Sequence, residues 1–462
     1  MRRAITNFGG NIRFTPAHCY LPATEADVLA LLDLHAHGKI RVVGAKHAWS
    51  AGIASDEALI DLRRLNAVSV ERDADGTTWV RAGAGCRIHR LLRVLHARTD
   101  MTLPSIGLIT EQTIAGAIST ATHGSGKSSL SHYVDEIRVA AYDPVTGKGR
   151  IFTFAEGTER RAARCALGYM GVVVSVRIRC VPKYDVVERI DACTTLDEAL
   201  AGEAEYPLQQ LFFIPHRWTF FAQRRAARPA STRRSLGARL YRAYWFFHLD
   251  LGFHFAIKAL ASMLRSPPLI RALYRRLLPW LVLQGRPVID TSERMLVMEH
   301  ELFKHLEIEI FVPATELHRA LDVVRAILSY CDDDSSAVTP EIWAALDLHG
   351  IGAELRPLRG TFTHHYPICI RRVLPDDTLI SMTAGEETYY ALSFITYVEP
   401  REPFYAMARI LARALTALHR GRLHWGKHFP LSHDDIKNAY PCLAEFRALC
   451  TRVDPRGVFR NV

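Results

Sequence analysis

The sequence predicts an α+β protein built mainly from two domains. Its 462 residues are enough for more than one hydrophobic core, and 49% hydrophobic residues exclude a disordered chain. Short apolar strands alternate with short helices in the first part, which is typical of α+β structure. A β-branched strand at 172–178 is followed by Pro182. We therefore expect domains at 11–183 and 184–415, with a C-terminal segment at 416–462.

The first domain should open with a helix whose start carries two capping residues. Thr24 is the expected N-cap and Asp27 occupies the capping-box position, so the helix should run to about residue 37. Alternation and turn signals predict the other elements. These are strands at 40–43, 59–62, 78–82, 136–142, 149–154 and 172–178, and a helix at 88–95.

The second domain is expected to be a mixed sheet with helices packed on it. A strand, a helix and a strand are predicted within 186–214. Further strands are predicted at 305–312, 378–381 and 389–397, and helices at 316–330, 404–418 and about 433–450.

Positive charge is concentrated in one segment. The net charge is +10, yet residues 217–286 alone hold 13 Arg and one Lys against a single acid, Asp250. The remainder is slightly acidic, which argues against a uniformly basic nucleic-acid binder. This basic, aromatic insertion predicts either contact with an anionic membrane surface or a helical cap with solvated arginines. Its uncharged runs are too short to span a bilayer.

Nine cysteines are scattered through the chain without a CxxC pair. An odd number without a framework predicts reduced thiols in a cytoplasmic setting and argues against a structural zinc site. The first ten residues have no apolar core after their arginines, so we expect no signal peptide. We predict no metal site.

Residues 112–126 form the most distinctive stretch of the sequence. They hold three glycines and five hydroxyl residues and almost no charge, which predicts a loop close to a large phosphorylated cofactor. Residues 121–128 also resemble a phosphate-binding P-loop. That hypothesis of a nucleotide triphosphatase lacks the first glycine, the preceding strand and a good first helical turn.

A second glycine lies at the end of a predicted strand. Gly44 would let the backbone bend toward a phosphate, and the amides of the following residues would cradle it. His47 would then lie beside the part of the ligand that is attached to that phosphate. Taken alone, the motif would favour a surface-loop histidine over a ligand contact.

These stretches occur together with a third, at 167–173. In this order, residues 43–50, 106–126 and 167–173 resemble the flavin-binding, PCMH-type domain of the vanillyl-alcohol oxidase/p-cresol methylhydroxylase superfamily. Residues 367–381, 424–427 and 454–461 are similar to its sugar-lactone and alditol oxidase branch, which includes gulonolactone and arabinonolactone oxidases. The resemblance covers nearly the whole chain except the basic insertion.

The resemblance implies FAD in the crevice between the two domains, with a covalent bond from His47 to the flavin 8α-methyl group. Lys427 would stabilise negative charge on the reduced flavin and help deprotonate the substrate. Arg371 and His424 complete the implied catalytic residues, although Arg371 alone would equally fit a structural salt bridge. The implied cofactor contacts are Gly44, Ala45, Lys46, His47, Ser50, Gly107, Thr113, Gly116, Thr120, Ala121, Thr122, His123, Val173 and Lys427.

Two positions bear on which substrate and which electron acceptor the implied enzyme uses. The branch usually carries Glu where this chain has Cys369, and a thiol is a poor hydrogen-bonding partner for substrate hydroxyls. Arg371, Cys369 and Leu108 are the implied substrate contacts, and a less polar or larger substrate than a sugar lactone is one alternative. Gly107 matches relatives that use dioxygen, where the missing methyl group would leave dioxygen a path to the flavin.

The sequence thus predicts an FAD-dependent oxidase that takes a hydride from a CH–OH group of a sugar lactone, alditol or related carbohydrate. Dioxygen would be the acceptor and hydrogen peroxide the product. One alternative is a membrane-associated dehydrogenase that passes electrons to a quinone or cytochrome. The remaining alternatives are the P-loop nucleotide triphosphatase and a non-catalytic protein that binds anionic surfaces.

Overall fold

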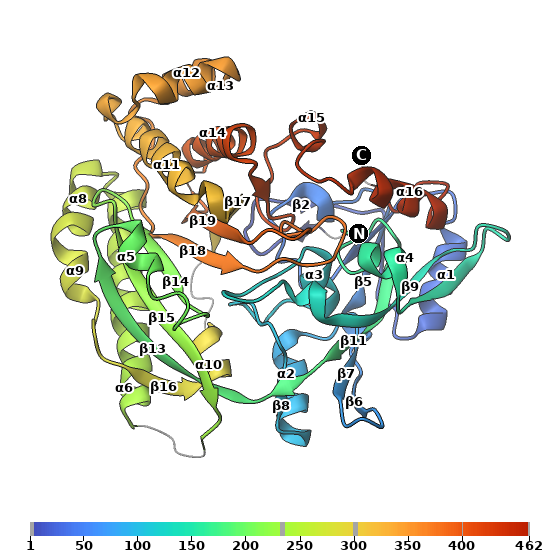
Figure 1. Ribbon diagram of the computed structural model, residues 1–462. Helices are drawn as coiled ribbons and strands as arrows, with labels where there is room; N and C mark the ends of the chain where they lie inside the picture. The colour runs from blue at the N-terminus through green and yellow to red at the C-terminus, as the bar shows by residue number, and fades with distance from the viewer. Residues whose placement is uncertain (1–3, 232–235, 299–303, 400, 461–462) are drawn as a thin grey trace.

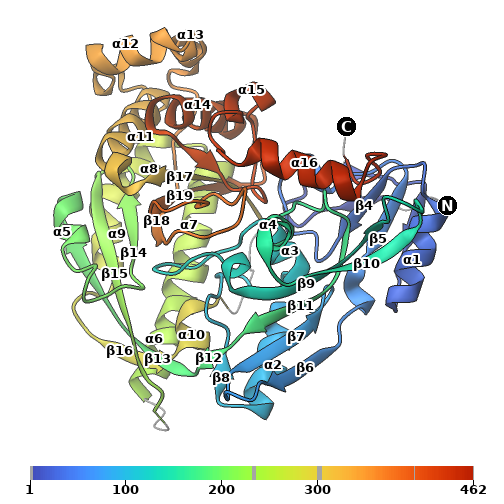
Figure 2. The ribbon, with the colours of Figure 1, turned by 45° about the vertical axis from the view of Figure 1, so that its right-hand side comes forward.

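The computed structural model describes residues 4–231, 236–298, 304–399 and 401–460. Two domains lie side by side, and the C-terminal helices run from one to the other (Figure 1). Figure 2 shows the blue-to-teal first domain on the right and the green strands of the second domain on the left.

The first domain contains two main sheets with helices packed on them. The larger is antiparallel in the order β10-β9-β11-β7-β6, and the smaller is parallel in the order β3-β5-β4. The larger sheet comprises β6 Val68–Arg72, β7 Thr78–Gly83, β9 Val134–Tyr142, β10 Gly149–Phe154 and β11 Val172–Arg179. The smaller comprises β3 His18–Tyr20, β4 Ile40–Val43 and β5 Ala58–Asp61. The helices are α1 Glu25–Leu34, α2 Ile88–Arg98, α3 Ile114–Ser119 and α4 Gly157–Ala163.

Two minor strand pairs complete this part, β1 Ile5–Thr6 with β2 Arg13–Phe14 and β8 Met101–Thr102 with β12 Val181–Pro182. The capping box predicted for the first helix is confirmed, because Thr24 accepts from the Asp27 amide while Asp27 accepts from the Thr24 amide. The predicted strands and helices of the first domain appear with shifts of a few residues at their ends.

The C-terminal segment packs on the first domain. Helix α16 Leu443–Val453 buries Phe446 and Cys450 in that domain's core. After it, the Asp454 carboxylate accepts hydrogen bonds from the amides of Val458 and Phe459. The Val458 carbonyl in turn accepts from the amide of Ile40, at the start of β4. The predicted last helix is therefore two helices, α15 His433–Ile436 and α16, and the second one buttresses strand β4.

The second domain is built on one sheet of eight strands in the order β16-β13-β15-β14-β18-β19-β17-β20. All its described pairings are antiparallel, so the predicted mixed sheet is wrong. Neighbours such as β14 and β15 are joined by a short turn, which forces antiparallel pairing. The strands are β13 Tyr184–Cys193, β14 Gln210–Ile214, β15 Thr219–Pro229, β16 Val288–Thr291, β17 His305–Pro313, β18 Ile368–Val373, β19 Tyr389–Tyr397 and β20 Arg422–Leu423.

The two faces of this sheet bury different partners. On one face, residues such as Phe213, Ile308 and Leu392 pack against α11 Leu317–Cys331 and α14 Glu402–His419. The opposite face carries Gln210, Cys369 and Glu309 toward the first domain and Ile214 and Phe221 toward a helical hairpin. The remaining helices are α5 Leu196–Leu200, α10 Ser292–Leu296, α12 Pro340–Leu348 and α13 Ile351–Leu355.

The helical hairpin is the structured part of the basic segment. It comprises α6 Leu236–Tyr244, a π-helix at Trp245–Phe253, α7 His254–Lys258, a second π-helix at Ala259–Met263, α8 Pro267–Ala272, a third π-helix at Leu273–Leu277 and α9 Leu278–Leu281. Residues 219–229 belong instead to β15, so the predicted insertion at 217–286 begins too early. Within the described residues, no helix combines the length and the apolar character needed to cross a membrane.

One predicted strand is a loop. Residues 378–381 form turns and bends because the buried Asp376 carboxylate gathers their polar groups. It accepts hydrogen bonds from the hydroxyl groups of Thr378, Ser381 and Ser129, which fix a compact loop that a sheet ladder would disrupt.

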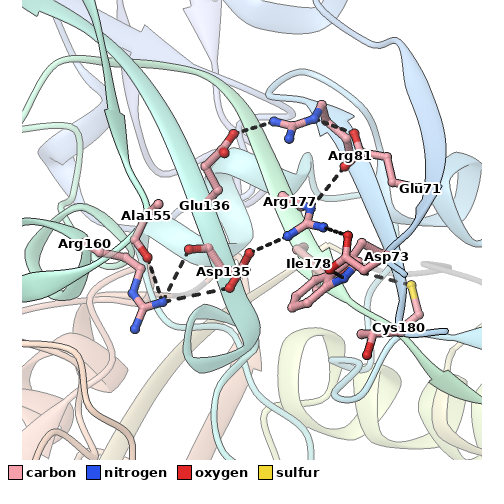
Figure 3. A network of polar contacts seen from close by, with 12 residues as sticks. Glu71, Asp73, Arg81, Asp135, Glu136, Ala155, Arg160, Arg177, Ile178 and Cys180 are labelled. Atoms are coloured by element: carbon pink, nitrogen blue, oxygen red, sulfur yellow. Dashed lines mark hydrogen bonds and ion pairs between the residues drawn. The ribbon is translucent and has the colours of Figure 1, made fainter. Parts of the chain in front are cut away.

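A network of ion pairs ties the strands of the first domain together (Figure 3). The Arg177 guanidinium on β11 contacts Glu71 at 3.0 Å, Asp73 at 2.6 Å and Asp135 at 2.7 Å. It also lies over the Trp79 ring at 4.1 Å. One side chain thus joins three neighbouring strands, and its side chain is only 16% exposed, so water screens it less than a surface pair.

We predict that Arg177→Ala lowers the free energy of unfolding by about 2 kcal/mol, because three carboxylates lose their shared cation. Arg150→Ala is the matched control, since its pair with Asp143 leaves the Arg150 side chain 63% exposed; it should cost at most about 0.5 kcal/mol. Urea unfolding of both variants checks this. Equal losses in the two variants would contradict the structural role of Arg177.

Candidate functional site

A cavity of about 810 Å³ lies between the first domain and the C-terminal segment. Four segments form its wall: the loop after β4, the start of α3, residues 167–173 and residues 424–433. Ten of the predicted cofactor contacts reach this cavity, together with His424, which was predicted as a catalytic residue. The ten are Gly44, Ala45, Lys46, His47, Ser50, Thr113, Gly116, Thr120, Val173 and Lys427.

The loop after β4 has the geometry of an anion-binding turn. Lys46 adopts a φ of +62°, a left-handed conformation that is costly for a residue with a side chain. Among the described residues, the amides of Ala45 and Lys46 donate no hydrogen bond, although both residues line the cavity. A Cβ atom at Gly44 would lie 1.9 Å from Thr113 Oγ1, so only glycine lets this loop approach α3. Free amides in such a turn suit phosphate oxygens.

His47 projects from the same loop. Its ring stacks on Phe8 with 4.9 Å between the ring centroids. Burial lowers the pKa of His47 to about 4, so its imidazole is neutral at pH 7. Trp49 anchors the end of the loop, because its indole N–H donates to the His305 carbonyl and its amide to Gly426.

Other predicted cofactor contacts lie outside the cavity. Ala121 and Thr122 are buried, and their amides bond to the carbonyls of Ile118 and Ala117. Gly107 is also buried, and a Cβ atom there would lie 2.7 Å from Thr122 Cγ2. Alanine at 107 would therefore have to displace Thr122, and the predicted dioxygen path stays a prediction. Residues 121–128 neither follow a strand nor begin an α-helix, which agrees with the argument against a P-loop.

The cavity ends at a buried cluster of charged side chains on β17. Glu307 and Glu309 project from the same face of this strand, and both accept a hydrogen bond from Ser393 Oγ, at 2.7 and 3.1 Å. Lys427 pairs with Glu307 and lies over the Trp49 ring at 4.5 Å.

Glu309 is paired with groups from both domains. His123 Nε2 of the first domain lies 3.4 Å from one of its oxygens, and Arg371 Nη1 of the second domain lies 3.6 Å away. Burial alone would raise the pKa of both carboxyls. The Lys427 ammonium outweighs it at Glu307, and His123 outweighs it at Glu309, so both pKa values fall below the usual range. Both groups are therefore carboxylates at neutral pH.

Two histidines adjoin these carboxylates. The His424 amide bonds to the Glu309 carbonyl, and its ring Nδ1 accepts a hydrogen bond from the Gly426 amide at 3.0 Å. Burial lowers the pKa of His424 to about 3, so the ring is neutral and carries its proton on Nε2. Nitrogen atoms of His123 and His424 and an oxygen of Glu309 lie within 4.8 Å of one another. That spacing also suits a metal ion, and the prediction of no metal stays a prediction.

A second, smaller cavity lies on the other side of this cluster. Predicted residues Leu108, His123 and Arg371 line it, together with polar Gln210 and Arg225. Much of the remaining wall is apolar, from Pro104, Ile106, Leu208, Leu296 and the Tyr184 ring. Cys369 lies behind Gln210, with 3.8 Å between Sγ and Oε1. Burial raises the pKa of its thiol, which identifies a packed, protonated group.

Sequence reasoning missed Glu307, Glu309, Ser393 and Gln210. The signal for the two acids was present, because residues 306–310 alternate Leu, Glu, Ile, Glu and Ile. Such alternation normally places acids in solvent. Here the first domain covers the face that carries the two acids. The strand was therefore predicted correctly, but the burial of its second face was not predicted.

Comparisons with known proteins agree with this geometry. The profile of the D-arabinono-1,4-lactone oxidase family matches residues 176–462, and that of an FAD binding domain matches residues 16–155. A long-chain alcohol oxidase of an uncultured marine euryarchaeote is 43% identical over 98% of this chain and 95% of its own length. The alditol oxidase of Streptomyces sp. (strain IKD472 / FERM P-14339) is 28% identical over 100% and 98%.

L-gulonolactone oxidase of Scyliorhinus torazame is 25% identical over 96% of this chain and 94% of its own length. Among solved structures, cholesterol oxidase from B. sterolicum superposes with a TM-score of 0.73 at 16% identity, covering 100% of this chain and 96% of that one. This last likeness supports the two-domain fold alone. The profile match over more than half of the sequence and the 43% identical relative show that the chain belongs to the D-arabinono-1,4-lactone oxidase family and carries an FAD-binding domain.

Proposed function

We propose that this FAD-dependent oxidase oxidises a CH–OH group that enters the second cavity and meets the charged cluster on β17. The observation that carries the proposal is the position of that cluster. Lys427 lines the cavity predicted for the cofactor, and Arg371 and His123 line the cavity beyond it. Glu307 and Glu309 join the two sides through direct contacts.

We further propose that FAD is held covalently through His47. The amides of Ala45 and Lys46 suit its pyrophosphate, and burial keeps the His47 imidazole neutral, the form that would bond to carbon. Forming this bond would release two protons and two electrons, which dioxygen would take up as hydrogen peroxide.

In the reaction, bound FAD would take the hydride from the alcohol carbon. The side chains of the protein would stabilise charge and take up the proton of the substrate hydroxyl group. Lys427 supplies a fixed cation that stabilises negative charge, and the Glu307 carboxylate beside it accepts the proton. Arg371, held by Gln210 Oε1 at 3.3 Å, and His424 orient the hydroxyl. Dioxygen would then receive the hydride equivalent, which is two electrons and one proton, together with the hydroxyl proton, which balances as hydrogen peroxide.

The second cavity has a volume of only about 30 Å³ in this structure, so it would have to widen to admit a substrate. Its lining favours an alcohol that has a polar end and an apolar remainder. Ile106, Leu108, Leu208 and Leu296 would contact the apolar part. Cys369 lies behind Gln210, outside this lining, and adds no charge. The name of the 43% identical relative, long-chain alcohol oxidase, agrees with this substrate class. A sugar lactone or alditol is the second candidate, because Gln210, Arg225 and Arg371 offer donors and acceptors for hydroxyl groups.

We predict that the purified protein is yellow and that the colour stays with the polypeptide after acid precipitation, because a covalent bond survives unfolding. His47→Ala should release the colour into the supernatant. His433→Ala is the control, since His433 lines the same cavity with a side chain that is 61% exposed. Colour that washes out of the parent protein would defeat the covalent bond, and a folded colourless protein would defeat flavin binding.

We also predict that a long-chain primary alcohol bleaches the flavin without oxygen faster than alditols or sugar lactones do. Absorbance changes over a panel of these compounds would measure this. Mixing the reduced enzyme with air-saturated buffer should restore the colour within seconds and yield one hydrogen peroxide per substrate. Recovery over many minutes would favour the alternative dehydrogenase with a quinone or cytochrome acceptor. Faster bleaching by alditols would reverse the substrate assignment.

A further inference from the structure

The helical hairpin at 236–281 presents one face to the protein and another to its surroundings. The segment from Leu236 to Met263 is one continuous helix, because α6, α7 and the two π-helices follow one another without a break. Ile257, Leu273, Tyr274 and Leu278 of the hairpin pack on the sheet. One side of the hairpin is thus packed against the protein core.

The other side is also apolar. Leu236, Leu240, Phe247, Phe255 and Met263 are exposed and follow at intervals of four, seven, eight and eight residues. These intervals correspond to one or two turns, so the five side chains form one stripe. Leu264, Leu269, Leu277 and Trp280, in the turn and the returning helices, are exposed as well. Met263 is 79% exposed and Trp280 88%, values that a buried cap would not show.

This concentration is specific to the hairpin. Within the described residues, eleven of the sixteen exposed large apolar side chains lie between Leu236 and Ile289. The others, such as Leu21, Val145 and Leu348, are separated along the chain. Scattered exposed apolar residues need no explanation, whereas a contiguous patch marks a surface that contacts another apolar phase.

Cations share this hairpin with the stripe. Arg239, Lys258, Arg275 and Arg276 are exposed on its helices and Arg265 in its turn, and Asp250 is the one acid in this part of the sequence. Other arginines of the basic segment have structural tasks: Arg225 pairs with Glu188, and Arg271 with Asp332. The hairpin therefore combines exposed apolar side chains with a net positive charge. An apolar face bordered by arginine and lysine complements anionic lipid headgroups above acyl chains.

The protein-facing side of the hairpin adjoins the second cavity. The Tyr241 hydroxyl of α6 donates to Glu188 Oε1 at 2.7 Å, and Glu188 Oε2 accepts from Arg225 Nε at 2.6 Å. Arg225 lines the second cavity. Tyr241 further packs with Leu208 and Leu296, two apolar residues of the same cavity wall. A single side chain thus connects the hairpin to the polar and the apolar walls of that cavity.

We propose that this face of the hairpin lies on the surface of an anionic lipid bilayer, with the apolar stripe at the level of the first acyl carbons. The proposal rests on the proposed function only in naming where an apolar alcohol would be met, since binding to lipid requires no catalysis. The hairpin thereby places the substrate cavity beside the membrane surface.

Vesicle flotation of the full-length flavoprotein tests the proposal. The parent should float with vesicles of phosphatidylglycerol and phosphatidylcholine, and much less with phosphatidylcholine alone or at high salt. The double variant Phe247→Asp/Trp280→Asp should bind at least about tenfold more weakly. Leu348→Asp is the matched control, because Leu348 is 82% exposed on α12, outside the hairpin, and should bind like the parent.

A second variant, Arg265→Gln/Arg276→Gln, should lose affinity for anionic vesicles while leaving the apolar stripe intact. Flavin absorbance reports folding of each variant, and alcohol oxidation without vesicles reports the proposed function separately. Absence of parent binding to anionic vesicles would overturn the proposal. So would a parent dimer that Phe247→Asp/Trp280→Asp converts to a monomer, because the face would then bind a second copy of the chain.

Discussion

The interaction on which this structure most depends is the neutralisation of two carboxylates in the middle of a buried strand. Glu307 and Glu309 are nearly inaccessible to water, and a buried charge without a partner costs several kcal/mol. Their partners come from every part of the chain: His123 from the first domain, Arg371 from the second and Lys427 from the C-terminal segment. Charge neutralisation therefore fixes how the parts meet, and it does so where the two cavities adjoin.

The loops around the cofactor cavity could be predicted because their residue types admit few conformations. Gly44 and the small residues of 112–120 signal close backbone approach, and Thr24 and Asp27 signal a helix start. The burial of the two acids of β17 could not be predicted, because alternation of apolar and polar residues shows that a strand has two faces. It does not show what covers the polar face. The loop at 378–381 was mispredicted because a β-like pattern says nothing of Asp376, whose carboxylate captures the hydroxyl groups. The limits of the basic segment were predicted from its charge, and charge does not distinguish strand β15 from the helical hairpin.

One face of the eight-stranded sheet combines two kinds of surface. Its β17–β18 side holds the charged cluster, and its β13–β15 side holds the hairpin, with Tyr241 and Leu208 between them. Cys369 lies behind Gln210 and adds no charge, while Glu307 keeps charge beside Lys427. The charged groups thus lie on the sheet, whereas the apolar wall of the second cavity comes mainly from loops and α10.

The central claim is that the Glu307–Lys427 pair adjoins the flavin, and the reduction potential of the bound flavin tests it most directly. Lys427→Met removes a cation and should lower the potential, because negative charge on the reduced flavin loses its stabilisation. Glu307→Gln removes an anion at the same place and should raise it. Glu341→Gln, on the exposed helix α12, should leave the potential unchanged. Shifts of opposite sign in the first two variants are the predicted result, and potentials equal to that of the parent in both would contradict the account.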